Sequence, residues 1–193
     1  DFEKKITKKS KAVIPVHYSG GVGNLDKIYK IAKNHKLRVI EDAAHAFGST
    51  YKNRKVGSFG DICCFSFDGI KNITSGEGGC VLSNSSEILN YISDARLLGV
   101  MKDSDKRKRN ERTWDPEVHI QGWRYHMSDI MAAIGRYQLK RFSTFSFKRK
   151  KLLKRYLQNL SCISKIRTLK YRIEKTVPHI FPIITVNDKL RDL

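Results

Sequence analysis

Short apolar runs and amphipathic helical patterns alternate along the first half of this chain. The runs lie at residues 11–18, 37–40, 62–67 and 80–83. Apolar runs of this kind are typical of strands that are covered on both faces, as in a parallel sheet. The sequence therefore predicts an α/β fold with a central sheet, and Pro15 weakens only the first of these strands.

Two helices are predicted beside the strands, and each begins after a residue that can cap it. Asn24 precedes one helical face at residues 25–32, and Ser85 precedes another at residues 88–95. Gly99 fits the C′ position of the second helix. The first helix and its flanking strands form a β-α-β unit, for which a right-handed crossover is expected.

The rest of the chain is predicted to hold two loops, two helices and a strand. Residues 49–61 favour a surface loop or small hairpin, and the charge-rich residues 102–112 favour a solvated loop. Helical periodicity covers residues 128–141 and returns at residues 152–160. Residues 180–186 are expected to form a strand of a second, incomplete domain.

The composition fits one ordinary domain with part of a second. The chain has 193 residues, of which 40% are hydrophobic, and this is enough for a real core. Its 38 Lys and Arg against 19 Asp and Glu give a formal net charge of +19. That charge permits attraction to nucleic acid, anionic lipid or phosphorylated small molecules, and does not choose among them.

The cysteines and the hydropathy pattern favour a reducing, cytoplasmic setting. Cys63, Cys64, Cys80 and Cys162 show neither a C-x-x-C pair nor zinc spacing, so we expect reduced structural thiols and no metal site. No apolar run approaches the roughly 20 residues of a membrane span. The polar residues 1–5 do not resemble a signal peptide. No membrane partner is therefore expected.

Two ligand hypotheses receive only weak support from the sequence. Gly21-Val22-Gly23 precedes an acidic strand end as in dinucleotide sites, but Asp26 stands in place of the third glycine, which favours a ligand-free turn. The basic residues 148–155, flanked by aromatic residues, could follow a phosphate backbone. Their helical spacing favours a solvated face instead, and no nucleic-acid partner is expected.

A third hypothesis is a ligand-binding site to which one carboxylate and one amine contribute. Asp42 follows the apolar Val39-Ile40, so its carboxylate is expected at the carboxyl end of a strand, where open α/β sheets bind ligands. Lys71 lies in a Ser- and Gly-rich segment between two apolar strands, and a partly buried amine can attack a carbonyl. The alternative for Asp42 is a capping or loop-anchoring role.

Three segments then resemble, in the same order, the signature segments of a known family. They are EDAAHAFGS at residues 41–49, GSFGDICCFSFDGIKNITSGEGG at residues 57–79 and GWRYHMSDIMAAIGRYQLKR at residues 122–141. The family is DegT/DnrJ/EryC1/StrS, the PLP-dependent sugar aminotransferases. The resemblance implies a three-layer PLP-transferase fold of the aspartate aminotransferase-like type I. Residues 1–127 would be part of the large domain, and residues 128–193 the connecting helices and the start of a small α+β domain.

The resemblance also implies roles for matching residues. Lys71 would form a Schiff base with pyridoxal 5′-phosphate and move protons, while Asp42 would pair with the pyridine nitrogen. The other expected contacts are the phenolic oxygen for His45, the ring face for Ala44, the phosphate for Ser66 and a dimer neighbour's phosphate for Arg124. Many members carry Asn in place of Arg124. His45 could instead be a core histidine, and Ser66 could instead form only a local hydrogen bond at the end of its strand.

The activity implied is a ping-pong transfer of an amino group from an amino acid, usually glutamate, to a keto-sugar nucleotide. The enzyme would be a cytoplasmic homodimer in nucleotide-sugar or polysaccharide biosynthesis. Lys71 disfavours dehydration, because related sugar dehydratases carry histidine there. Family members are nearly twice as long, so we expect a fragment that binds the cofactor poorly alone. Two alternatives stay open, an inactive fragment of such an enzyme and a NAD-type nucleotide-binding domain.

Overall fold

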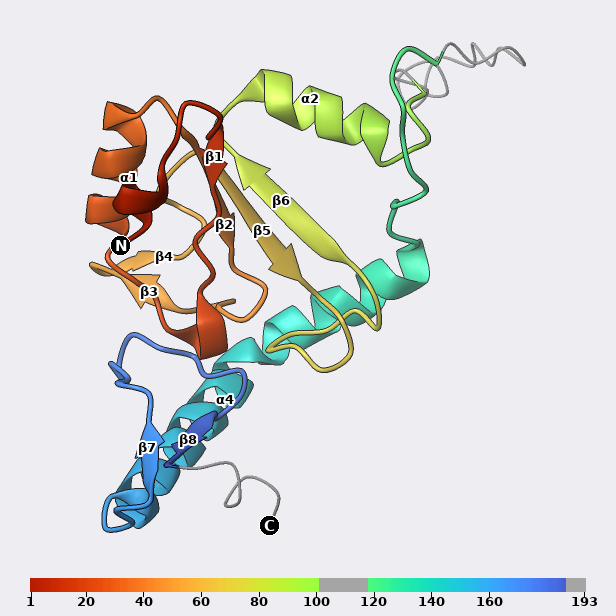
Figure 1. The fold of residues 1–193 in the computed structure, drawn as a ribbon. Coiled ribbons are helices and arrows are strands. Elements are labelled where there is room, and N and C mark those ends of the chain that lie inside the picture. Colours follow the sequence, from red (N-terminus) through yellow and green to blue (C-terminus); the bar gives the residue numbers. More distant parts are fainter. Residues whose placement is uncertain (101–117, 187–193) are drawn as a thin grey trace.

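The structure is a computed structural model that describes residues 1–100 and 118–186 (Figure 1). Its centre is a four-stranded sheet in the order β1-β2-β5-β6. The strands are β1 (Ala12–Val13), β2 (Arg38–Asp42), β5 (Ile62–Ser66) and β6 (Gly79–Ser83). β1, β2 and β5 are parallel, but β6 is antiparallel to β5, so the sheet is mixed. A loop joins β5 to β6 in place of a crossover helix, which lets the chain reverse direction.

The first predicted strand is much shorter than expected. Of residues 11–18, only β1 and a single bridge between Val16 and Asp42 pair with the sheet. Pro15 has no N–H to donate to a ladder. The chain then turns through a short 3₁₀ segment at Tyr18–Gly20 (η2), which removes these residues from the strand. A second 3₁₀ segment, η1, lies at Phe2–Lys5.

The two predicted helices of the first half are confirmed as α1 (Leu25–Asn34) and α2 (Ser86–Ala95). The Asn24 side chain accepts from the Lys27 N–H at 3.1 Å, and Ser85 caps α2 in the same way. The predicted small hairpin is also present, as β3 (Thr50–Tyr51) and β4 (Arg54–Lys55).

The prediction that Gly99 occupies the C′ position of α2 was wrong. The C-cap of α2 is Arg96, so Gly99 lies two residues beyond the C′ position. Leu98 and Gly99 both have positive φ, and the Gly99 N–H still donates to the Asp94 carbonyl oxygen. An extra turn after the helix therefore moves the glycine away from the cap.

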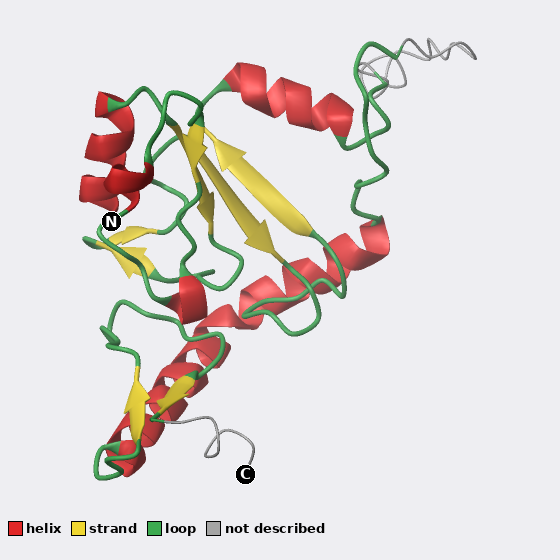
Figure 2. Cartoon of the chain, viewed as in Figure 1, coloured by secondary structure: helices red, strands yellow, loops and turns green. Residues whose placement is uncertain are grey.

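The two helices predicted after residue 128 are one helix, α4 (Asp129–Leu160), shown unbroken in Figure 2. Ser128 caps it by accepting from the Met131 N–H. The residues between the two apolar patterns contain neither proline nor glycine, so nothing ends the helix there. The predicted boundary was therefore wrong.

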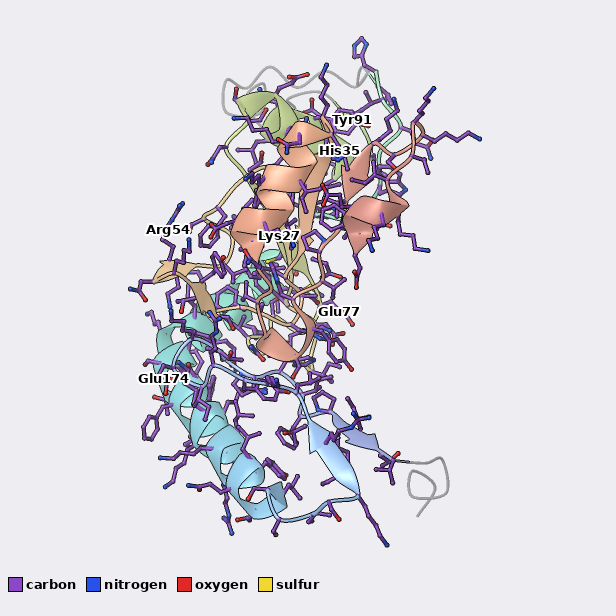
Figure 3. The ribbon with its side chains drawn as sticks, turned by 60° about the vertical axis from the view of Figure 1, so that its left-hand side comes forward. Lys27, His35, Arg54, Glu77, Tyr91 and Glu174 are labelled. Atoms are coloured by element: carbon purple, nitrogen blue, oxygen red, sulfur yellow. The ribbon has the colours of Figure 1, made fainter. Side chains whose placement is uncertain are left out.

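A two-stranded sheet lies beside the C-terminal half of α4. It pairs β7 (Ile166–Thr168) with β8 (Ile183–Thr185), and side chains project into the space between this segment and α4, where a cavity of about 450 Å³ remains (Figure 3). β8 confirms the predicted strand at residues 180–186, whereas the three-residue β7 was not predicted. The boundary between residues 127 and 128 stays a prediction, and residues 102–112 lie outside the described residues.

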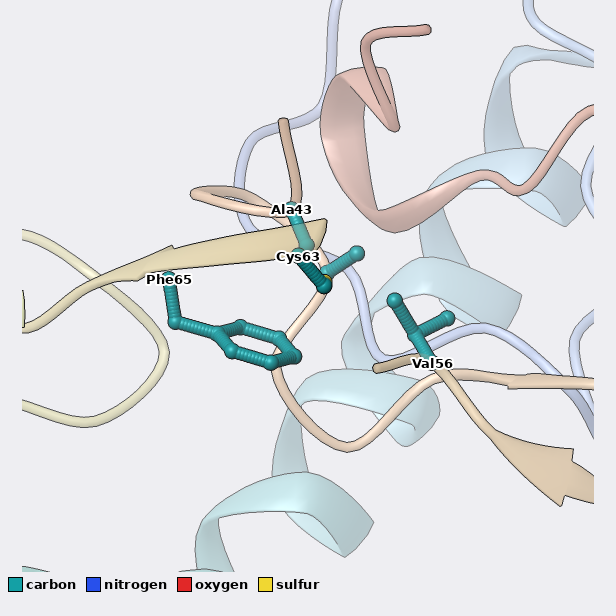
Figure 4. Close-up of a cluster of buried hydrophobic side chains, with 5 residues drawn as sticks. Ala43, Val56, Cys63 and Phe65 are labelled. Atoms are coloured by element: carbon teal, nitrogen blue, oxygen red, sulfur yellow. The ribbon is translucent and has the colours of Figure 1, made fainter. Parts of the chain in front are cut away.

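One cluster of buried hydrophobic side chains lies around β5, the segment that follows β2 and residue 56 after β4. Its buried members are Ala43, Ala46, Val56, Cys63 and Phe65, four of which are labelled in Figure 4. All four cysteines are free thiols, and burial raises the pKa of Cys63. Within residues 1–100 and 118–186, no helix has the length and apolar character needed to cross a membrane.

Candidate active site at the carboxyl edge of the sheet

Asp42 ends β2 at the carboxyl edge of the sheet, as the sequence predicted. Its N–H donates to the Pro15 carbonyl oxygen at 3.0 Å, and its carbonyl oxygen accepts from the His17 N–H at 2.9 Å. Its Oδ1 accepts from the Ala44 N–H at 3.1 Å, the bond expected of a loop-anchoring aspartate. Because this bond uses one lone pair of one oxygen, the carboxylate can still accept a hydrogen bond from a ligand.

Lys71 lies half-buried in the loop of residues 67–78. Its N–H donates to the Asp68 carbonyl oxygen at 3.1 Å. The next residue, Asn72, is buried, and its Nδ2 donates to the Val177 carbonyl oxygen at 3.1 Å. A segment that follows α4 therefore holds the loop that carries Lys71.

Lys71 also lines a cavity of about 270 Å³ between its loop and α4. Thr74 and Gln138 contribute polar groups to the wall, and Lys148 and Arg149 contribute cations. Three basic side chains around one cavity favour an anionic group inside it.

His45 connects Asp42 to Lys71 electrostatically. Burial lowers the pKa of His45, the charge of Lys71 lowers it further, and the Asp42 carboxylate opposes both effects. The Ser19 N–H donates to His45 Nδ1 at 3.4 Å, so Nδ1 is the acceptor and a neutral ring carries its proton on Nε2. The structure thus brings Asp42, His45 and Lys71 together at one edge of the sheet.

Glu41 precedes Asp42 in β2, and its environment is very different. Strand alternation sends its side chain to the opposite face, where His17 Nε2 lies 2.7 Å from its Oε2. The Tyr29 hydroxyl donates to the other oxygen at 2.6 Å, and burial with this bond raises the pKa of Tyr29. Both carboxylate oxygens are occupied, so Glu41 is not available to a ribose and the dinucleotide hypothesis loses support.

Ser66 and Ala44 lie near this edge, each at the position expected from its strand. Ser66 ends β5, and its Oγ accepts from the Asp68 N–H at 3.3 Å, the local contact expected of a strand-end serine. Its hydroxyl proton is still available to a ligand. Ala44 is half-buried two residues after Asp42.

Arg124 does not join this group within the chain. It is exposed and forms an isolated β-bridge with Leu97, just beyond α2. The neighbouring Trp123 and Tyr125 rings are stacked with centroids 6.1 Å apart. The predicted role of Arg124, which reaches toward a dimer neighbour, stays a prediction.

His179 is a site residue that the sequence did not indicate. Its ring centroid lies 4.4 Å from that of His45, and its Nδ1 is buried without a hydrogen-bond partner among the described residues. Burial, together with the nearby His45, Lys71 and Arg149, lowers its pKa from 6.5 to about 4, although Asp68 opposes this shift. Pro178-His179 carries no local motif, so only the tertiary structure could reveal it.

A buried hydrogen-bond network fixes the segments around the site. Ser49 Oγ donates to the Gly20 carbonyl oxygen at 2.9 Å and accepts from the Val177 N–H at 2.9 Å. The Val177 carbonyl oxygen accepts from Asn72. The turn before α1, the loop after β2, the Lys71 loop and the segment after α4 are therefore tied together.

Comparisons with known proteins identify relatives of this chain. The chain is 38% identical over 185 residues to the GDP-perosamine synthase of Caulobacter vibrioides, an alignment that covers 96% of the chain and 47% of that protein. Its fold matches Helicobacter pylori PseC, an aminotransferase of pseudoaminic acid biosynthesis, with a TM-score of 0.84 and 31% identity over 97% of this chain and 48% of that one.

A third relative has been solved in its PMP form. It is the putative sugar aminotransferase Spr1654 of Streptococcus pneumoniae, with a TM-score of 0.85 and 27% identity over 96% of this chain and 52% of that one. The chain therefore spans about half the length of the relatives that it matches. The model of one protein family also matches residues 1–192. Together with the edge that carries Asp42, His45 and Lys71, this match shows that the chain belongs to the DegT/DnrJ/EryC1/StrS aminotransferase family.

Proposed function

We propose that this chain forms the cofactor-holding part of an aminotransferase that uses pyridoxal 5′-phosphate and acts on a keto-sugar nucleotide. The observation that carries the proposal is the position of Asp42 at the end of β2, beside His45 and close enough to Lys71 for both charges to act on the His45 ring. A carboxylate, an imidazole and a primary amine thus share one sheet edge, which is where α/β folds bind ligands.

The side chains at this edge fit the proposed cofactor. Asp42 keeps acceptor capacity beyond its bond to Ala44, and Ser66 keeps a hydroxyl proton. The buried Nδ1 of His179, which has no partner among the described residues, is a further group that a ligand could satisfy. When bound, the cofactor supplies an aldehyde that an amine can attack and an electron-withdrawing pyridine ring.

Each side chain then has a defined task. The Lys71 Nζ acts as the nucleophile and later carries a proton to and from the substrate carbon. The Asp42 carboxylate holds a proton at the pyridine nitrogen, and Ser66 donates to the phosphate. His45 donates through Nε2 to the phenolic oxygen, because its Nδ1 already accepts from Ser19.

The substrates are proposed from relatives and from charge. GDP-perosamine synthase and PseC support a nucleotide-linked keto-sugar as the amino acceptor. The basic cavity beside Lys71 suits an anionic donor such as glutamate. We further propose a homodimer in which Arg124, exposed in its own subunit, binds the phosphate of the neighbouring site.

Reduction with borohydride in the presence of pyridoxal phosphate, followed by peptide mapping, tests this proposal. At a concentration of pyridoxal phosphate high enough to offset weak binding by this chain, the label is expected on Lys71, and Lys71→Ala should remove it. Lys148→Ala is the matched control, because Lys148 lines the same cavity and should leave the label in place. A label carried mainly by another lysine would overturn the assignment. NAD, titrated by calorimetry, should give no binding signal.

A further inference from the structure

Arg149 of α4 holds the backbone beside the candidate site. Its Nη1 donates to the Pro178 carbonyl oxygen at 3.3 Å and to the His179 carbonyl oxygen at 3.0 Å. The guanidinium is partly buried, and burial lowers the pKa of Arg149. No carboxylate in the described part of the chain forms an ion pair with it. Its hydrogen bonds to these two carbonyl groups therefore offset part of the cost of burying its charge.

The backbone of residues 177–179 is thereby fixed from two sides. Arg149 binds residues 178 and 179 from α4, while the Val177 N–H and carbonyl oxygen bind Ser49 and Asn72 beneath the sheet edge. Ser19 adds a third anchor just beyond, because its Oγ donates to the Ile180 carbonyl oxygen at 2.5 Å. Because this backbone is already held, a side chain on it loses only its own rotamer freedom when it packs.

That side chain is His179, which packs on His45. The two rings are tilted by 47° with their centroids 4.4 Å apart, and Tyr18 lies on His45 with a centroid distance of 5.7 Å. Ser19 meets His45 at Nδ1. His45 is thus held by contacts from Tyr18, Ser19 and His179, and the His179 contact depends on the segment that Arg149 fixes.

We propose that Arg149 and His179 are positioning residues: Arg149 fixes the backbone of His179, and the His179 ring holds His45 in place between Asp42 and Lys71. The assignment rests on the proposed function, because the orientation of His45 matters to catalysis only if the cofactor binds there. The contacts themselves can be tested without the cofactor.

The test is a titration of the His45 ring by NMR in the cofactor-free chain. The groups that face His45 are Asp42, Lys71, Tyr18 and His179, and Arg149 does not act on its pKa directly. His179→Ala opens the His45 ring to water, so its pKa should rise toward the ordinary value. Arg149→Leu should raise it in the same direction, because the His179 ring is released.

Two conservative variants and one control sharpen the result. Arg149→Lys keeps the charge and one donor group, and His179→Phe keeps the ring, so both should fold and show smaller changes. Lys150→Met is the matched control, since Lys150 lies next to Arg149 on α4 and also donates to a backbone carbonyl, that of Glu174 at 2.7 Å. It should leave the His45 titration unchanged.

Cofactor binding provides the second measurement. Arg149→Leu should weaken binding of pyridoxal phosphate about tenfold, the scale of one lost hydrogen bond to a charged group, whereas Lys150→Met should not. An unchanged His45 titration in folded Arg149→Leu and folded His179→Ala would overturn the positioning assignment. Absence of any label on Lys71 in the unaltered chain, even at saturating pyridoxal phosphate, would instead overturn the proposed function, so the two failures can be distinguished.

Discussion

The His17 Nε2 atom lies 2.7 Å from the Glu41 Oε2 atom, and each side chain is only 1% exposed. Glu41 is adjacent to Asp42, and the His17 N–H binds the Asp42 carbonyl oxygen. The buried pair therefore fixes the strand end from which the Asp42 carboxylate projects. Removal of one partner would leave the other buried without its counterpart.

Glu41→Ala should lower the free energy of unfolding by about 3 kcal/mol, the scale found when one partner of a buried pair is removed. Urea unfolding followed by circular dichroism measures the change. Lys52→Ala is the control, because Lys52 pairs with Asp26 on the exposed surface and should cause a much smaller loss. Equal losses of unfolding free energy in the two variants would show that the buried pair contributes no more stability than the exposed one.

Ser49→Ala should destabilise the chain and reduce labelling of Lys71. The substitution leaves the Val177 N–H and the Gly20 carbonyl oxygen without their buried partner, which costs about 1–3 kcal/mol. Ser161→Ala is the matched control, because its hydroxyl bonds a carbonyl at the exposed end of α4. The unfolding midpoint and the borohydride labelling of Lys71 should both fall in Ser49→Ala and stay unchanged in Ser161→Ala.

Gly20→Ala should be far more damaging than Gly76→Ala. Both glycines have positive φ, +84° and +88°, so both substitutions carry the same backbone strain of roughly 1 kcal/mol. A Cβ at Gly76 meets open space, whereas one at Gly20 collides with the Val177 carbonyl oxygen. Because the backbone strain is shared, the difference between the unfolding free energies of the two variants measures the cost of the collision at residue 20. Similar values would contradict the close packing of Gly20 against Val177.

Acidification should destabilise the chain in part through His179. Burial and the nearby His45, Lys71 and Arg149 lower its folded pKa from 6.5 to about 4, so the unfolded state binds a proton more readily between these values. This contribution is fully present above pH 6.5 and is lost as the pH falls toward 4. The unfolding free energy of His179→Phe should therefore decline less over this range, as measured by urea titrations at several pH values. An equal decline of the unfolding free energy in the unaltered chain and in His179→Phe would show that groups other than His179 cause the acid sensitivity.

Local sequence patterns were sufficient for the elements whose signals are short-range. The caps Asn24 and Ser85, the strands around Val39 and Cys63, and the position of Asp42 at a strand end were all predicted from neighbouring residues. Capping, periodicity and strand alternation act over a few residues, so they can be read without the fold. The resemblance of three ordered segments added the family, which the match over residues 1–192 confirmed.

Tertiary contacts decided the rest. The sequence placed Asp42 at a strand end and Lys71 in a glycine-rich loop, but it could not show that His179 lies on His45 or that Arg149 holds the segment that carries it. It also missed the continuity of α4 and the pairing of β7 with β8. The continuity of α4 is a local property that the sequence prediction missed. His45 and His179 lie more than 100 positions apart, Arg149 lies 30 positions before His179, and the three-residue β7 and β8 depend on the partner that each finds. Such contacts form only when the chain packs, because no local interaction energy encodes them.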